Sequence, residues 1–186
     1  LAGILNFCGE VREEKGSYLV KVHTENVSVA KRFFTLLKDT FHIHGELQVK
    51  RNEYLKRSRN YSVFVDKHED CVLLLKAVKY FEPKNFGLVL QNTCCKRAYI
   101  RGAFLAAGSM SDPEKNYHFE IVTLHEQFAV QLQDVLDFFE LDAKIVIRKK
   151  YYVVYIKEGA KIVDVLNIME AHIALMNLEN VRILKD

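Results

Sequence analysis

A pattern of glycines in apolar surroundings occurs twice in the chain, at a constant offset of 99 residues. Gly3 and Gly9 lie in the opening segment, and Gly102 and Gly108 lie at the matching positions of a second segment. The offset continues beyond the glycines and pairs Tyr18 with Tyr117, Thr24 with Thr123, Ala30 with Ala129, Phe33 with Leu132 and Leu37 with Leu136. So long a match at one register predicts two copies of one structural unit.

Both copies show the same succession of patterns. Each begins with an apolar helix that carries its two glycines. A strand with period-two alternation follows, and then an amphipathic helix, a two-stranded hairpin and a closing helix. We expect the single strands near 18–22 and 117–121, the amphipathic helices near 30–37 and 126–139, the hairpins at 47–50 with 61–65 and 145–147 with 152–156, and the closing helices at 69–78 and 160–170.

These patterns divide the chain into four parts. Residues 1–82 form the first repeat and residues 100–170 form the second. The segment 83–99 is predicted to be a linker, because Pro83 is expected to end a helix. The segment 171–186 belongs to neither repeat, and we expect a helix that leads towards a domain this chain does not contain.

Composition favours a folded cytoplasmic protein. The chain is 49% hydrophobic, which supports a core, and no apolar run approaches the length of a membrane span. The chain lacks an initiator Met, so we expect that an N-terminal segment has been removed or is unseen. The four cysteines form no CxxC pair, which favours reduced thiols, and we expect no cofactor. His42 and His44 alone do not make a metal site, and a solvated turn is expected there.

A plain helix–helix interface accounts for the four glycines. Glycine lets two backbones approach closely where helices cross, and that gain offsets its unfavourable helix propensity. Two such helices in one chain could pack on each other and join the two units. Gly3, Gly9, Gly102 and Gly108 are therefore predicted as interface glycines without any catalytic role.

The opening residues Leu1–Gly9, LAGILNFCG, resemble the LAGLIDADG motif of homing endonucleases. The resemblance implies an α+β chain with a tandem duplicated αββαββα fold and pseudo-two-fold symmetry. In that family the residue before the second glycine is an acid that holds the metal for DNA cleavage. Here those positions hold Cys8 and Ala107, and the other motif acid is replaced by Asn6 and Leu105. Magnesium requires hard oxygen ligands, so we expect no catalytic residue, no metal and no enzyme activity.

The second half resembles the WhiA family of bacterial regulators more closely. The segments that carry the resemblance are 94–109 (CCKRAYIRGAFLAAGS), 117–121 and 167–183. The resemblance implies a degenerate nuclease domain joined to a C-terminal helix-turn-helix domain, which lies beyond this chain and makes most contacts with double-stranded DNA. It further implies a nucleoid-associated transcription regulator with roles in sporulation, cell division and chromosome segregation. A protein partner is a further possibility, and a membrane is not expected.

Basic hairpins are the candidate DNA contacts of this chain. Residues 1–99 carry 17 Lys and Arg against 11 Asp and Glu, whereas residues 100–186 carry 10 against 13. Glu46 and Glu120 occupy strand positions from which they would repel phosphates, so we expect weak electrostatic binding. The alternative is that the hairpin tips are charged only for solubility. The candidate backbone contacts are Lys50, Arg51, Lys56, Arg57, Arg59, Arg148, Lys149 and Lys150.

Two other functions compete with this interpretation. One is an endonuclease that uses an unconventional acid such as Glu10, and it requires magnesium-dependent cutting that Glu10→Gln abolishes. The other is a module that binds a protein or a small molecule through the former DNA-binding surface. That module would show no salt-sensitive DNA binding. It would bind another partner saturably and lose it when a residue such as Lys21 or Arg148 is changed.

Overall fold

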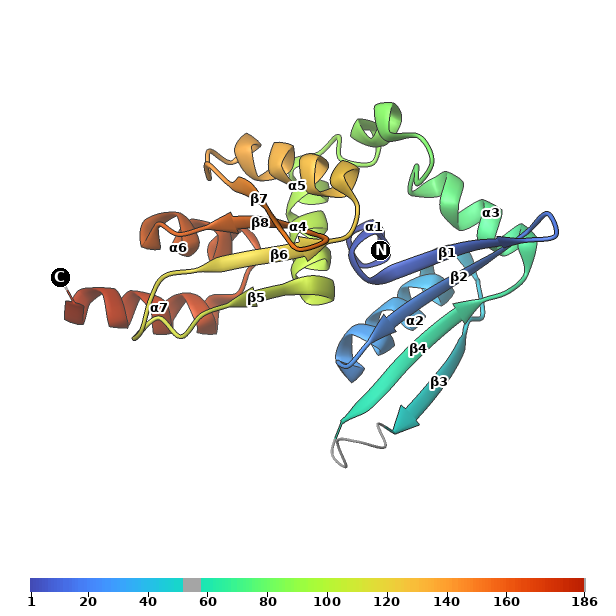
Figure 1. Ribbon diagram of the computed structural model, residues 1–186, viewed down its shortest axis with the longest axis horizontal. Helices are drawn as coiled ribbons and strands as arrows, with labels where there is room; N and C mark the ends of the chain where they lie inside the picture. The colour runs from blue at the N-terminus through green and yellow to red at the C-terminus, as the bar shows by residue number, and fades with distance from the viewer. Residues whose placement is uncertain (52–57, 186) are drawn as a thin grey trace. The chain divides into compact units, whose positions relative to one another are not determined.

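The computed structural model of the chain divides into two compact units, Leu1–Gln91 and Asn92–Asp186. The structure describes residues 1–51 and 58–185. Each unit has its own antiparallel sheet, its own helices and its own core (Figure 1).

The first unit contains a four-stranded sheet with the strand order β1-β2-β4-β3. Helices α2 and α3 pack against this sheet, on β4 and β2 respectively. The elements in chain order are α1 (Ala2–Cys8), β1 (Gly9–Glu14), β2 (Ser17–Thr24), α2 (Val27–Phe41), β3 (Glu46–Arg51), β4 (Arg59–Val65), α3 (His68–Ala77) and the 3-10 helix η1 (Pro83–Leu88).

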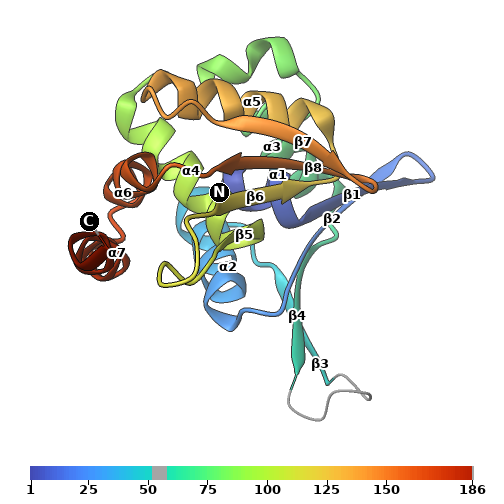
Figure 2. The ribbon, with the colours of Figure 1, turned by 60° about the vertical axis from the view of Figure 1, so that its left-hand side comes forward.

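The second unit repeats this topology with the strand order β5-β6-β8-β7. Figure 2 shows α5 lying along one side of this sheet. The αββαββα order and the α+β class are therefore confirmed for both units. The elements are α4 (Thr93–Ala107), β5 (Gly108–Met110), β6 (Phe119–Thr123), α5 (Glu126–Phe138), β7 (Lys144–Arg148), β8 (Tyr151–Ile156), α6 (Gly159–Ile168) and α7 (His172–Lys185).

The core of each unit forms where its amphipathic helix meets the sheet. Ala30, Phe33 and Leu37 of α2 are fully buried, as are their counterparts 99 residues later, Ala129, Leu132 and Leu136 of α5. The strands supply the opposite wall with buried residues at matching positions, Val22 in the first unit and Ile121 in the second. The equivalent burial confirms that the repeat seen in the sequence is a repeat of structure.

Local signals at both ends define helix α2. The Asn26 side chain caps the helix by accepting a hydrogen bond from the Ser28 N–H at 2.9 Å. The helix stops at His42, whose φ of 56° lies in the left-handed region. His42 and His44 are both exposed, as expected for a solvated turn.

Strands β1 and β5 are the elements that the residue pattern does not predict. The pattern indicates one strand between the first two helices of each copy, whereas the structure contains two. Strand β1 is an edge strand with the sequence GEVREE, which lacks apolar alternation, and β5 has only three residues. The turn between β1 and β2 is Lys15-Gly16, with φ of 52° and 79°. Two central residues with positive φ are typical of a tight two-residue hairpin.

The second glycine of each motif lies outside its helix. Helix α1 ends at Cys8 and α4 ends at Ala107, so Gly9 and Gly108 are the first residues of β1 and β5. The expectation that these two glycines are helical is therefore wrong. Both have extended backbone conformations, and the Gly9 N–H still donates to the Leu5 carbonyl. The role of the four glycines in packing between helices stays a prediction.

The segment predicted to be a linker contains helical structure. Pro83 begins the 3-10 helix η1, and α4 begins at Thr93, within the expected linker 83–99. A proline in the first position of a helix lacks only an N–H that would be unsatisfied there, so Pro83 starts a helix instead of ending one. The preceding helix ends at Ala77, and Lys79 follows with a φ of 54°.

The helix predicted near the C-terminal end is present as α7. It packs on α6 and buries Leu178. The Lys185 ammonium donates to the Pro113 carbonyl at 2.7 Å and lies 5.2 Å from the centre of the Tyr117 ring. These contacts attach α7 to the second unit. Within residues 1–51 and 58–185, no helix is both long enough and apolar enough to cross a bilayer.

Candidate nucleic-acid interface

Each sheet has one face that the helices cover and one that they leave open. Directly opposed residues of antiparallel strands lie on the same side of a sheet, so the register defines both faces. In the first unit Val20, Val22, Val63 and Val65 are buried on the covered face. The open face of sheet 1, the sheet of the first unit, consists of Glu10, Arg12, Glu14, Ser17, Leu19, Lys21, His23, Glu46, Gln48, Lys50, Asn60, Ser62 and Phe64.

The open face of sheet 1 carries as many acids as bases. Arg12 Nε lies 2.6 Å from Glu10 Oε1, and Lys21 Nζ lies 5.5 Å from the centre of the Phe64 ring. The remaining charges are Lys50, Glu14 and Glu46, so the formal charges cancel. Although the first half of the chain is the more basic one, this face does not present a net positive field to a phosphate backbone.

The predicted basic cluster of the first hairpin is divided between the two faces. Lys50 lies on the open face opposite Asn60. Arg51 and Arg59 are opposed to each other on the other face, at the end of the β3–β4 pairing. Lys56 and Arg57 lie outside the described residues. Because successive residues of a strand alternate sides, the structure does not bring Lys50 together with Arg51 and Arg59.

The open face of sheet 2 is more basic. Its acidic side chain is Glu120. Its basic side chains are Lys144 and Arg148 on the edge strand β7, and Lys157, which directly follows β8 and points to the same side as Tyr155. Lys149 and Lys150 form the exposed two-residue turn next to Arg148, so the structure does bring these three predicted contacts together. The face consists of Ser109, Glu120, Val122, Lys144, Val146, Arg148, Tyr151, Val153 and Tyr155.

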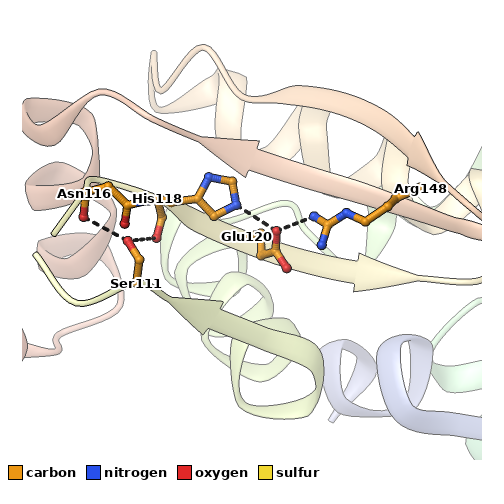
Figure 3. A network of polar contacts seen from close by, with 5 residues as sticks. All are labelled: Ser111, Asn116, His118, Glu120 and Arg148. Atoms are coloured by element: carbon orange, nitrogen blue, oxygen red, sulfur yellow. Dashed lines mark hydrogen bonds and ion pairs between the residues drawn. The ribbon is translucent and has the colours of Figure 1, made fainter.

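A network of polar side chains crosses this face (Figure 3). Glu120 Oε2 lies 2.7 Å from His118 Nε2 and 2.7 Å from an Arg148 guanidinium nitrogen. Ser111 Oγ donates to the Asn116 carbonyl at 2.9 Å and so fixes the loop that leads to His118. The sequence indicated that Glu120 faces this surface, but it gave no sign that Arg148, 28 residues away, would be its partner. One of the candidate phosphate contacts is thus already paired with a carboxylate.

The contacts of Glu120 set its proton affinity. Burial raises the pKa of this carboxyl, because the Glu120 side chain is only 14% exposed. The hydrogen bonds from His118 and Arg148 favour the carboxylate more strongly, and the pKa therefore lies below its usual value of 4.5. A carboxyl whose pKa is lower in the folded state stabilises the fold above its unfolded pKa. That contribution is lost as the pH falls through the folded pKa.

Glu120→Gln is expected to flatten the acid limb of the stability profile. The native protein should lose free energy of unfolding between about pH 5 and pH 3, and the variant should lose about 1 kcal/mol less over that interval. Urea denaturation at a series of pH values measures this difference. The matched control is Asp142→Asn, because that carboxylate is 76% exposed and pairs with Lys144 at 3.3 Å. Parallel profiles for the native protein and Glu120→Gln would contradict the assignment.

The two positions before the second glycines, Cys8 and Ala107, hold no ligand for a hard cation. Burial raises the pKa of the Cys8 thiol to about 12, so the thiol stays protonated near neutral pH. Ala107, at the end of α4, has no ligand atom. Glu10 lies two residues beyond Cys8 and is engaged by Arg12, and Ser109 stands at the matching place in the second unit. These residues do not fit the divalent-metal site of a homing endonuclease.

A metal ion could also be held elsewhere by a group of His, Cys, Asp and Glu side chains. In the part of the chain that the structure describes, no group of three or more is placed to hold a metal ion. All four cysteines are free thiols. The arrangement on the open faces is therefore one of charges and aromatic rings.

Comparisons of the sequence with known families agree for both units. Residues 1–79 match the WhiA N-terminal LAGLIDADG-like domain, and residues 96–186 match the WhiA LAGLIDADG-like domain. A probable cell division protein WhiA of Lachnoclostridium phytofermentans is 50% identical over 195 residues, and that of Alkaliphilus oremlandii is 44% identical over 196 residues. Both alignments cover 100% of this chain, which spans 62% and 61% of the two relatives.

Solved structures share the fold at low sequence identity. Full-length DUF199/WhiA from Thermatoga maritima has a TM-score of 0.74 and 19% identity, over 99% of this chain and 58% of that one. The homing endonuclease I-WcaI, solved bound to its DNA recognition sequence, has a TM-score of 0.63 and 15% identity, over 91% of this chain and 78% of that one. The chain therefore belongs to the WhiA family, and its two units have the LAGLIDADG fold.

Proposed function

We propose that this chain is a non-catalytic part of a DNA-binding transcription regulator and contributes electrostatic contacts to duplex DNA. The observation that carries the proposal is the open face of sheet 2 with its adjoining turn. Five cations, namely Lys144, Arg148, Lys149, Lys150 and Lys157, stand there against two carboxylates, Glu120 and Asp142, the second of which pairs with Lys144 at 3.3 Å. Such a surface attracts phosphates without reading a base sequence.

Loss of nuclease activity belongs to the same proposal. Phosphodiester cleavage of the homing-endonuclease kind uses a metal held by carboxylates. Cys8 and Ala107 provide none at the motif positions, and Glu10 forms an ion pair with Arg12. The ancestral fold is thus proposed to hold DNA without cutting it.

The cellular role is inferred from the family. The curated relatives are named probable cell division proteins. We infer a nucleoid-associated regulator that acts in cell division, sporulation and chromosome segregation. Recognition of a specific DNA sequence is assigned to a helix-turn-helix domain beyond this chain, and the present units add non-specific affinity.

The test is binding of a labelled duplex across a series of NaCl concentrations, followed by fluorescence anisotropy. Each neutralised phosphate contributes about −0.9 to the slope of log affinity against log salt. Replacing Lys149 and Lys150 by Gln should therefore weaken binding at low salt and make the slope less steep by about 1.8. The matched control is Lys31→Gln, an exposed lysine on helix α2.

Two results would contradict the proposed function. Absence of binding at low salt would assign all DNA contacts to other parts of the protein and favour a docking module. Magnesium-dependent cutting of a supercoiled plasmid, abolished by Glu10→Gln, would restore the nuclease. Intact plasmid after incubation with magnesium is the expected result.

A further inference from the structure

The open face of sheet 2 carries aromatic rings as well as charges. Tyr151 and Tyr155 lie four residues apart on β8, so both point to the same side of the sheet. Strand β8 is an inner strand, flanked by β6 and β7. At about 3.3 Å per residue, the two rings are separated by roughly 13 Å along the strand. They are therefore two separate ring positions on one surface.

Each tyrosine has a lysine over its ring and a further cation opposite it on β7. Lys150 Nζ lies 5.5 Å from the centre of the Tyr151 ring, and Lys157 Nζ lies 5.3 Å from that of Tyr155. On the edge strand β7, Arg148 is directly opposite Tyr151 and Lys144 is directly opposite Tyr155. Both rings thus stand where a negatively charged chain would be held.

The residues between the tyrosines are apolar. Val146 is opposed to Val153 there; 45% of Val146 is exposed, whereas Val153 is buried. Tyr151 is itself 38% exposed. At the Tyr155 end, His118 stacks on the tyrosine with ring centres 6.0 Å apart and an interplanar angle of 21°. The acid Glu120 is engaged by His118 and Arg148, which reduces its repulsion of phosphates.

We propose that this face binds single-stranded nucleic acid, with unpaired bases stacking on Tyr151 and Tyr155 and phosphates lying along Lys144, Arg148, Lys150 and Lys157. Every base offers a flat π-face to an aromatic side chain, and such stacking tolerates any sequence. In a duplex the base faces are stacked on one another and are not available to the tyrosines. The proposal uses the same face as the proposed function, but it identifies an unpaired strand as the ligand that fits the face best.

The test compares a labelled oligothymidine of about 15 nucleotides with a duplex of equal length, in the same buffer. Native protein should bind the single strand more tightly. Tyr151→Leu should weaken single-strand binding at least about fivefold and leave duplex binding unchanged, because stacking on one aromatic ring contributes at least that factor. Tyr151→Phe keeps the ring and should retain native affinity.

The matched control is Phe138→Leu. Phe138 is also exposed and also has a lysine over its ring, Lys96 at 4.5 Å, but it lies at the end of α5 and not on the open face. Circular dichroism checks that each variant is folded. The inference would be overturned if Tyr151→Leu weakened the binding of both ligands equally or of neither, or if only the duplex were bound. In each of these cases the duplex proposal would still stand. Binding of neither ligand would remove both, and binding of the single strand alone would remove only the duplex proposal.

Discussion

Gly108→Ala is expected to lower the free energy of unfolding by about 3 kcal/mol, the upper part of the usual range for overpacked sites. A Cβ at Gly108 would lie 2.6 Å from Cγ of the Phe104 ring and 2.7 Å from the Phe104 carbonyl oxygen. The ring has little freedom to move away, because it stacks on Phe119 with ring centres 5.0 Å apart. The carbonyl belongs to the last turn of α4 and moves only if the helix end is distorted.

Gly9→Ala should have a similar effect in the first unit. There a Cβ would collide with the Leu5 carbonyl oxygen and would lie 2.7 Å from Leu5 Cδ1. Gly87→Ala is the matched control, since a Cβ at Gly87 meets nothing within 4 Å, and we expect a change within about 0.5 kcal/mol. Urea denaturation measures all three variants. Midpoints for Gly9→Ala and Gly108→Ala equal to that of the native protein would refute this account of the glycines.

This crowding explains why the motif glycines are found here without the motif acids. The chain turns from a helix into a strand at Gly9 and again at Gly108, and each turn brings the glycine against the residue four positions earlier. The geometry requires a residue without a side chain whether or not a metal is bound next to it. The glycines of the motif therefore have a structural reason to be present without the motif acids.

The sequence predicted the repeated elements well because burial in each unit follows the same positions. Phe33 and Leu132, or Leu37 and Leu136, are apolar in the sequence and fully buried in the structure. Strand β1 could not be found in this way, since most of its side chains are charged and exposed. The packing that requires glycine at positions 9 and 108 could not be predicted from the sequence either. It depends on the close approach of one carbonyl group to the Cα of each glycine.

The candidate interface was predictable only in part. Because successive residues of a strand point to opposite sides, the sequence alone places Lys50 and Arg51 on different faces of the sheet. A count of the basic residues in the hairpin does not make this distinction. The charge of each half of the chain was a poor guide, because the first half is the more basic one while the open face of sheet 1 is balanced. The ion pair between Glu120 and Arg148 depends on the positions of β6 and β7 on either side of β8, which no local pattern encodes.

Cys8 is expected to react with iodoacetamide about a thousandfold more slowly in the folded protein than in the unfolded chain. The thiolate is the reactive form, and burial raises the pKa of Cys8 from 9.0 to about 12. At pH 8 the folded protein should therefore hold about a thousandth of the Cys8 thiolate present in the unfolded chain. Alkylation at pH 8, with and without urea, followed by peptide mass spectrometry, gives both rates. Cys94 is the internal control, because it is exposed and should react readily in both conditions.

The same measurement tests whether Cys8 binds a metal ion. If Cys8 stood in for the motif acid as a metal ligand, it would be held as a thiolate, and a divalent cation would change its rate of alkylation. A protonated thiol with no affinity for magnesium should react at one slow rate with or without millimolar magnesium. Comparable rates in the folded and unfolded chains would contradict the raised pKa. A rate that depends on magnesium would reopen the possibility of a metal at the end of α1.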